Sequence, residues 1–187
     1  MSEDTSWRSP TRVSLNIAVL YAATYYVADD RGTVGKAREV LDRYNIDLRV
    51  WPEDGKKGGG NLLGDITAPI PHRKEAYEAL RRRVNEQIRG RCGFSVVMPA
   101  VFCQYEHRGY GITPEWFRLV TPGCLIFPTG NPDMMDLVHE IGHGAGCDHV
   151  FGDRAAEREN FMHEANGRST IRRSQVEKLI KASFAVA

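Results

Sequence analysis

The chain of 187 residues contains few cysteines, which argues against a fold held together by disulfides. Its four cysteines lie far apart, so the sequence has neither a Cys-x-x-Cys metal knuckle nor the cysteine density of a small secreted scaffold. Free, buried thiols are therefore expected. The four residues are Cys92, Cys103, Cys124 and Cys147.

Long apolar runs and an excess of charge of one sign are also lacking. The apolar stretch at 13–28 contains Asn16, Thr24 and three tyrosines and is too short and too polar to span a bilayer. The first charged residues are Glu3 and Asp4, whereas an export signal begins with basic residues. The net charge of +1 provides no chain-wide attraction to nucleic acid or membrane. We expect a cytoplasmic protein without a nucleic-acid or membrane partner, and leave secretion by another route open.

The glycine-rich segment 53–64 lacks the Gly-Lys-Ser/Thr sequence that would make it a phosphate-binding P-loop. Its run of three glycines predicts a mobile surface loop instead. A phosphate-binding function is therefore not expected from this segment.

Hydrophobic periodicity predicts strands and helices that alternate along the first two thirds of the chain. Runs rich in β-forming residues predict strands, and apolar residues three and four positions apart predict amphipathic helices. The expected strands are residues 13–21, 47–51, 94–98 and 123–128. The expected helices are residues 33–44 and 71–89, with a closing helix at residues 174–184.

The segment HEIGHGAGCDH combines three potential metal ligands with a carboxylate. Residues four apart lie on one face of a helix, so His139 and His143 can hold one metal ion together. The Glu140 carboxylate can reach a water molecule on that ion. Gly146 can end the helix with a positive φ, after which the chain turns back and His149 can bind as the third ligand. Three histidines leave one tetrahedral position open, as in catalytic zinc sites.

The residues just before this segment predict where its helix begins. Asn131 is a favourable N-cap, and Pro132 suits the first helical position. Asp133 and Asp136 favour the positive end of the helix dipole. A helix that begins near residue 132 is expected.

The histidine pattern resembles that of the metzincin clan of zinc peptidases, which is H-E-x-x-H-x-x-G-x-x-H followed by a turn that contains a methionine. Met162, thirteen residues after His149, corresponds to the methionine of this Met-turn. The resemblance implies an α+β fold with an α/β-like N-terminal half. Such a fold has a twisted mixed β-sheet with a backing helix, a zinc-binding active-site helix, and a small C-terminal subdomain with the Met-turn and a final helix.

The resemblance also implies a domain organisation. Residues 1–12 would form an N-terminal tail, and residues 13–187 a single catalytic domain. Its upper subdomain would comprise residues 13–146 and its lower subdomain residues 147–187.

Several positions near the histidines leave the subfamily unassigned. Val150 follows the third histidine, where matrixins have serine, astacins glutamate and adamalysins aspartate. Glu164 occupies the position at which astacins and serralysins have a tyrosine that can bind zinc. Two roles stay open from the sequence alone: Cys147 can face the metal or pack inward, and His163 can tune the site, bind substrate or lie at the surface.

The function implied by the pattern is zinc-dependent peptide hydrolysis, in the manner of an endopeptidase. One zinc ion would be held by His139, His143 and His149, with Glu140 as the general base. The expected partner is a protein or peptide substrate, extended along a sheet edge formed by residues 105–120. Two alternatives stay open, namely a zinc amidase acting on a non-protein amide such as a peptidoglycan peptide, and a non-catalytic metzincin-like binding domain. Because an unrestrained peptidase would threaten its host, narrow specificity or an inhibitory or delivery partner is also hypothesised.

Overall fold

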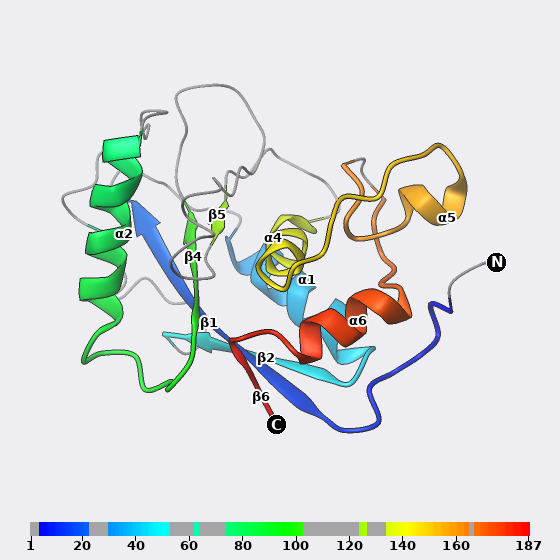
Figure 1. Ribbon diagram of the computed structural model, residues 1–187, viewed down its shortest axis with the longest axis horizontal. Coiled ribbons are helices and arrows are strands. Elements are labelled where there is room, and N and C mark those ends of the chain that lie inside the picture. Colours follow the sequence, from blue (N-terminus) through cyan, green and yellow to red (C-terminus); the bar gives the residue numbers. More distant parts are fainter. Residues whose placement is uncertain are drawn as a thin grey trace.

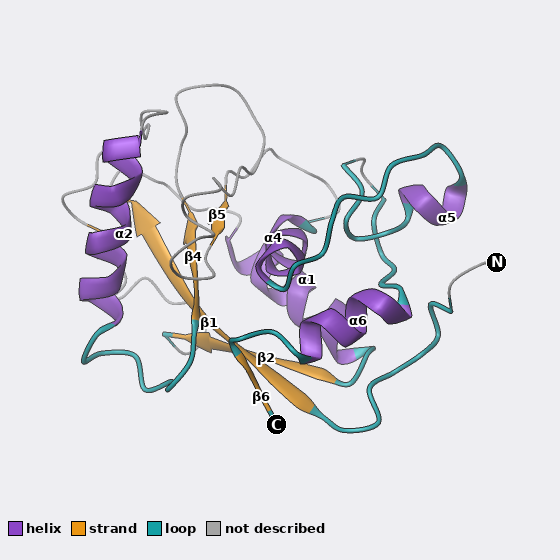
Figure 2. Ribbon diagram, in the orientation of Figure 1, coloured by secondary structure: helices purple, strands orange, loops and turns teal. Residues whose placement is uncertain are grey.

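A computed structural model describes residues 4–22, 30–52, 62–63, 74–102, 124–126, 134–164 and 167–187. These residues form a mixed α+β fold with one β-sheet and helices on both of its faces (Figures 1 and 2). The strands are β1 (Val13–Ala22), β2 (Ile46–Trp51), β3 (Leu62–Leu63), β4 (Met98–Phe102), β5 (Cys124–Ile126) and β6 (Ala185–Val186). The helices are α1 (Asp30–Asp42), α2 (Lys74–Ile88), α4 (Asp136–Gly144), α5 (Ala155–Arg158) and α6 (Arg173–Ile180).

Strand β1 is the central strand of the sheet. Ile17 pairs with both β2 and β4, so these strands lie on opposite sides of β1. Tyr21 pairs with β3 and β4, which places β3 on the β2 side, and Leu15 pairs with β2 and β6, which places β6 on the β4 side. Strand β5 extends the sheet beyond β4. All of these pairings are parallel except that of β6, so the described sheet is mixed.

The two faces of β1 are both buried, which explains its nearly continuous apolar sequence. Alternate side chains of the strand point to one face, where they join the main core with residues of α1, α4 and α6. Ala18 and Leu20 point to the other face, on the side of the sheet where α2 lies (Figure 1). Leu80 and Val84 of α2 are buried there. The core-facing residues of β1 are Leu15, Ile17, Val19 and Tyr21.

Most of the predicted elements are confirmed, with shifted ends. The predicted strands at 13–21 and 47–51 correspond to β1 and β2, and the segment 123–128 contains β5. The helices predicted at 33–44 and 71–89 are α1 and α2. The closing helix predicted at 174–184 is α6, which ends earlier, at Ile180. The predicted sheet-edge segment at 105–120 lies outside the described residues.

The strand predicted at 94–98 is wrong in position. Strand β4 begins at Met98 and continues to Phe102, through Pro99. A proline removes a donor from a strand ladder and is therefore expected only at the start or edge of a strand. Pairing between β4 and β5 begins at Ala100, so Pro99 precedes the region in which β4 has neighbours on both sides.

The surface loop predicted at 53–64 is also corrected in part. Leu62 and Leu63 form the short strand β3, which pairs in parallel with Tyr21 and Ala22 at the end of β1. The rest of that segment lies outside the described residues. A strand of two residues has no periodicity of its own, so the neighbouring glycines dominated the sequence pattern.

The predicted beginning of the histidine-bearing helix is wrong as well. Helix α4 begins at Asp136, with Met135 as its N-cap, whereas the sequence predicts a beginning near Pro132. The later beginning of the helix has a backbone cause. Met134 has a φ of 53°, which is outside the right-handed helical region. Residues 131–133 lie outside the described residues.

Residues 4–12 contact the body of the protein at several points. The Asp4 carbonyl accepts a hydrogen bond from the Arg173 amide at 3.2 Å, and the Arg173 guanidinium lies 5.2 Å from the centre of the Trp7 ring. The Ser9 amide donates to the Tyr44 carbonyl at 3.1 Å. The division into a tail and two subdomains stays a prediction.

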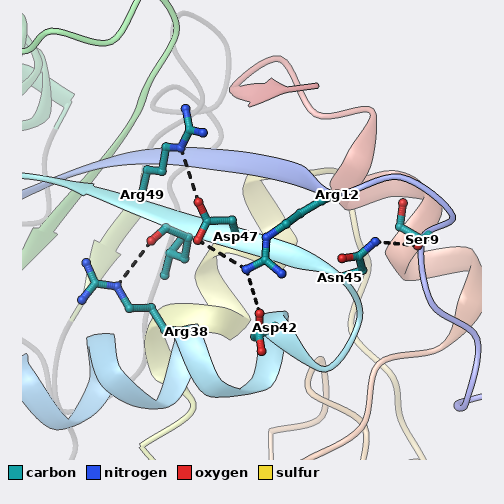
Figure 3. Close-up of polar contacts among 8 residues, drawn as sticks. Ser9, Arg12, Arg38, Asp42, Asn45, Asp47 and Arg49 are labelled. Atoms are coloured by element: carbon teal, nitrogen blue, oxygen red, sulfur yellow. Dashed lines mark hydrogen bonds and ion pairs between the residues drawn. The ribbon is translucent and has the colours of Figure 1, made fainter.

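The connection between α1 and β2 has a polar surface (Figure 3). Arg12 contacts the carboxylates of Asp42 and Asp47, at 2.8 and 3.9 Å, and Arg49 contacts Asp47 from the same strand at 3.4 Å. All of these side chains are exposed. Within the described ranges, every helix falls short of the length and apolar character that a membrane span requires.

Candidate metal centre

Helix α4 carries the first two histidines and is itself fixed by apolar contacts. Leu137, Val138 and Ile141 are fully buried, and the helix packs against α1 and β5. His139 and His143 are one helical turn apart and lie on one face, as predicted. The buried side of the helix therefore determines where this pair of imidazoles points.

The turn after α4 brings the third histidine to the first two. Gly146 has a φ of 81°, a conformation that other residues resist, which confirms the predicted role of this glycine in ending the helix. The Gly146 amide donates to the His143 carbonyl at 2.9 Å, and its own carbonyl accepts from the Lys178 ammonium at 2.7 Å. The chain then reverses direction, and His149 lies beside the helix.

The three imidazoles converge through their Nε2 atoms. These atoms are 3.1 Å apart between His139 and His143, 3.2 Å between His139 and His149, and 2.9 Å between His143 and His149. In a tetrahedral zinc site with bonds of about 2.0–2.1 Å, ligand atoms lie about 3.4 Å apart. The three nitrogens therefore form a group that could hold one metal ion of this size after shifts of a few tenths of an ångström.

Backbone carbonyls orient the first two imidazoles. His139 Nδ1 lies 2.8 Å from the Phe161 carbonyl oxygen, and His143 Nδ1 lies 3.1 Å from the Cys147 carbonyl oxygen. Because a carbonyl can only accept a hydrogen bond, each Nδ1 must carry a proton, and in the neutral form of the ring Nε2 then has the lone pair. This is the tautomer that a metal ligand needs, and hydrogen bonds of this kind are typical of metal-binding histidines.

A carboxylate lies beside the outer nitrogen of the third imidazole. Glu164 Oε1 is 3.5 Å from His149 Nδ1. The sequence shows Glu164 only as a departure from the tyrosine that astacins and serralysins have at this position. The structure places it where a carboxylate can orient a metal-binding histidine.

Burial affects the ionisation of His139 and Cys147 in opposite directions. Desolvation, together with the neighbouring His143, lowers the pKa of His139 to about 3, so this imidazole is neutral near pH 7. Burial raises the pKa of the Cys147 thiol to about 11. Cys147 packs inward as part of the core, and only its carbonyl takes part in the centre.

Glu140 follows His139 on α4 and is 3% exposed. A carboxylate is costly to bury in a protein interior. Buried ionisable groups beside metal-binding side chains are typical of functional sites. The position of Glu140 therefore agrees with the role that the sequence predicts for it, although its catalytic role stays a prediction.

A tight turn formed by Asn160–His163 lies against α4. The His163 amide donates to the Asn160 carbonyl at 2.9 Å, which closes the turn. The carbonyl of Met162 accepts from the Val150 amide at 3.0 Å. One turn thus supports both the His139 ring, through the Phe161 carbonyl, and the backbone next to His149.

Gly142 allows this turn to approach the helix. A Cβ atom at this position would lie 2.5 Å from the Phe161 ring and would also overlap the Met162 sulfur. Both of these side chains are fully buried. The space above Gly142, between His139 and His143 on the helix, is therefore filled by the turn.

A reciprocal amide pair anchors the same turn to α6. Asn160 Nδ2 donates to Gln175 Oε1 at 2.8 Å, and Gln175 Nε2 donates to Asn160 Oδ1 at 3.0 Å. Asn160 Oδ1 also accepts from the Met162 amide at 3.0 Å. Asn160 is fully buried and Gln175 nearly so. Neither residue belongs to the histidine pattern, and a long-range pair of this kind has no signal in the sequence.

A buried arginine links the segment after the turn to the beginning of α4. Arg168 Nη2 lies 3.2 Å from Asp136 Oδ1, and its Nη1 lies 3.4 Å from the His163 carbonyl oxygen. The Arg168 side chain is 4% exposed. Asp136 therefore has two features: it lies in the first turn of α4, and it is an ion-pair partner of Arg168.

Some of the residues singled out in the sequence come together in the structure, and His163 lies apart from them. His139, His143 and His149 come together, and Met162 lies against α4 between the first two. His163 does not join the cluster, because its Nε2 contacts the Gly152 carbonyl oxygen at 3.0 Å.

Comparison with known proteins does not identify a function for this group of residues. No protein-family model matches the sequence. No curated protein matches it either. Among solved structures, two crystal forms of wild type OgpA from Akkermansia muciniphila align with all of this chain and 67% of that chain, with 12% sequence identity and a TM-score of 0.49. A similarity of this size carries no functional conclusion, so the function is inferred from the site.

Proposed function

We propose that the protein is a zinc-dependent peptidase of the metzincin type. The observation that carries the proposal is the convergence of three Nε2 atoms, two of whose imidazoles also have a carbonyl oxygen at hydrogen-bond distance from the outer nitrogen. Such an arrangement fixes the metal-binding tautomer before any ion arrives.

Zinc is the ion that this ligand set suits best. Three imidazole nitrogens match its preference for nitrogen ligands and tetrahedral geometry, and they leave one position for water or substrate. A zinc ion held by His139, His143 and His149 would supply a Lewis acid that polarises a carbonyl group and acidifies a bound water molecule. The proton transfers of the reaction would be carried out by a side chain of the protein.

Glu140 would move the proton. Its carboxylate oxygen would accept a proton from the attacking water as the water oxygen bonds to the peptide carbonyl carbon. The same oxygen would then deliver the proton to the leaving amine as the carbon–nitrogen bond breaks. The position of Glu140 supports this role, since it is buried in α4 directly after His139.

Met162 would serve as the methionine of the Met-turn. Support comes from its complete burial, from the tight turn in which it lies, and from its sulfur next to Gly142. In this role the side chain fills the space beneath the imidazoles, and the backbone of the turn holds His139. Its contribution is therefore to position the ligands.

The expected substrate is a protein or peptide, extended along a sheet edge at residues 105–120. That segment lies outside the described residues, so this part of the proposal stays a prediction. Restraint by narrow specificity, or by an inhibitory or delivery partner, also stays a hypothesis.

The direct test is hydrolysis by the zinc-loaded chain and by its Glu140→Gln variant. An unfolded protein and a mixed peptide library serve as substrates, and mass spectrometry locates the cuts. We expect cleavage by the wild type and a loss of at least about 100-fold in the variant, with one zinc bound by both. Equal cleavage by both chains would contradict the role of Glu140. Cleavage of a peptidoglycan peptide alone would identify the amidase alternative, and zinc binding without any hydrolysis would favour a binding domain.

A further inference from the structure

Phe151 is the most exposed of the large apolar side chains among the described residues. Its exposed fraction is 71%, compared with 41% for Met134 and 37% for Val96. A single exposed apolar residue is ordinary on a protein surface. Phe151 differs because of where it lies and how its backbone is held.

The ring of Phe151 lies beside the third ligand. Its centre is 5.7 Å from that of the His149 imidazole, and the two rings are nearly perpendicular at 86°. Edge-to-face packing of this kind is favourable and directional. It gives the Phe151 ring a defined place next to the metal centre while most of its surface remains in water.

Hydrogen bonds fix the backbone on both sides of this residue. The Val150 amide donates to the Met162 carbonyl at 3.0 Å, and His163 Nε2 contacts the Gly152 carbonyl oxygen at 3.0 Å. Both partners belong to the turn that supports His139. The loop therefore cannot fold Phe151 inward without breaking contacts to that turn.

We infer that Phe151 is a specificity-determining residue, which contacts a large apolar side chain of the substrate near the scissile bond. This inference rests on the proposed peptidase function. Side chains on one face of an extended peptide recur about every 6.7 Å. A ring centred 5.7 Å from the His149 imidazole lies within about 9 Å of a metal bound at its Nε2 atom, a span of two to three residues of an extended peptide. Water would be displaced from both apolar surfaces on binding.

His163 acquires a role in the same arrangement. It is a positioning residue, since its ring holds the Gly152 carbonyl and thereby the loop that presents Phe151.

The inference can be tested on the zinc-loaded protein with hydroxamates, which bind an open zinc position whether or not peptides are cleaved. The probes are acetohydroxamate and peptidyl hydroxamates with either alanine or phenylalanine at each of the two positions on either side of the chelating group. The proteins are the wild type, Phe151→Ala, Phe151→Leu and the control Val96→Ala. Melting temperatures monitor folding.

We expect the wild type to prefer a phenylalanine-bearing probe over its alanine counterpart by about tenfold at one position. Phe151→Ala should reduce this ratio to nearly one, Phe151→Leu should retain part of it, and Val96→Ala should retain all of it. Acetohydroxamate affinity, measured for all four proteins, reports any change at the zinc centre itself, and the ratio between the two peptidyl probes cancels that change. In peptide cleavage, the same preference should appear in kcat/KM.

An unchanged ratio in Phe151→Ala, or no preference in the wild type, would overturn the inference while leaving the peptidase proposal intact. Failure of acetohydroxamate to bind the zinc-loaded wild type would contradict the open coordination position, and the inference would fall with it.

Discussion

An arginine–aspartate ion pair occurs both on the α1–β2 surface and near the histidine cluster. The first pair is exposed to solvent and the second is mostly buried. On the surface, the Arg12–Asp42 ion pair measures 2.8 Å, and the two side chains are 56% and 63% exposed (Figure 3). Near the histidines, the Arg168–Asp136 pair measures 3.2 Å, with exposed fractions of 4% and 21%. The shorter pair is therefore the more hydrated one.

This difference shows that distance alone does not rank such contacts. An exposed pair contributes about 0–1 kcal/mol, because water and salt compensate for its loss. A buried group that loses its partner keeps its desolvation cost, so the loss is much larger. Around the histidines, the polar contacts also orient the groups that would bind the metal.

The largest effect on stability is expected from Arg168→Met. Removing the guanidinium leaves Asp136 and the His163 carbonyl without this partner in a mostly buried location. We expect a loss of about 2–4 kcal/mol in the free energy of unfolding. Denaturant unfolding of the metal-free chain measures it, and a loss below about 0.5 kcal/mol would show that the contact behaves as a surface pair.

An intermediate effect is expected from Gly142→Ala. The added methyl group would overlap the Phe161 ring and the Met162 sulfur, so the turn must move away from α4. Overpacking of this kind costs about 1–3 kcal/mol. Zinc affinity, measured by competition with a chelator, should also fall, because the turn holds His139.

Gly35→Ala is the matched control for that substitution. Gly35 also lies in a helix, but a Cβ atom there would meet nothing within 4 Å. Alanine is the better helix former, so we expect a gain of about 0.5–1 kcal/mol and unchanged zinc affinity. Similar effects of the two substitutions would contradict close packing between Gly142 and the turn.

The smallest effect is expected from Arg12→Ala on the α1–β2 surface. Its contacts with Asp42 and Asp47 are exposed, and the predicted change in the free energy of unfolding is about 0–0.5 kcal/mol. Repeating the measurement in high salt should remove most of it. A loss of unfolding free energy comparable to that of Arg168→Met would show that exposed and buried ion pairs contribute equally to stability here.

The parts of the centre that depend on local geometry were predictable from the sequence. The one-turn spacing of His139 and His143 fixes their common face, and the backbone freedom of Gly146 allows the reversal that brings in His149. Strand β1 was predictable for a similar reason, since its β-forming residues fill both faces of a central strand.

The supporting contacts were not predictable, because each joins residues far apart in the chain. The reciprocal amide pair of Asn160 and Gln175 and the ion pair of Arg168 and Asp136 depend on tertiary packing. In the sequence, Glu164 is visible only as a mismatch with the tyrosine of astacins and serralysins. The beginning of α4 was missed because the positive φ of Met134 is unusual for its residue type and has no sequence signal.

X-ray absorption at the zinc edge of the zinc-loaded chain tests the central claim most directly. The account predicts three imidazole nitrogens and one further light atom at about 2.0–2.1 Å, with no sulfur. His149→Ala should reduce the imidazole count to two. A sulfur shell at about 2.3 Å, or a spectrum unchanged in His149→Ala, would contradict a catalytic centre built on these three histidines.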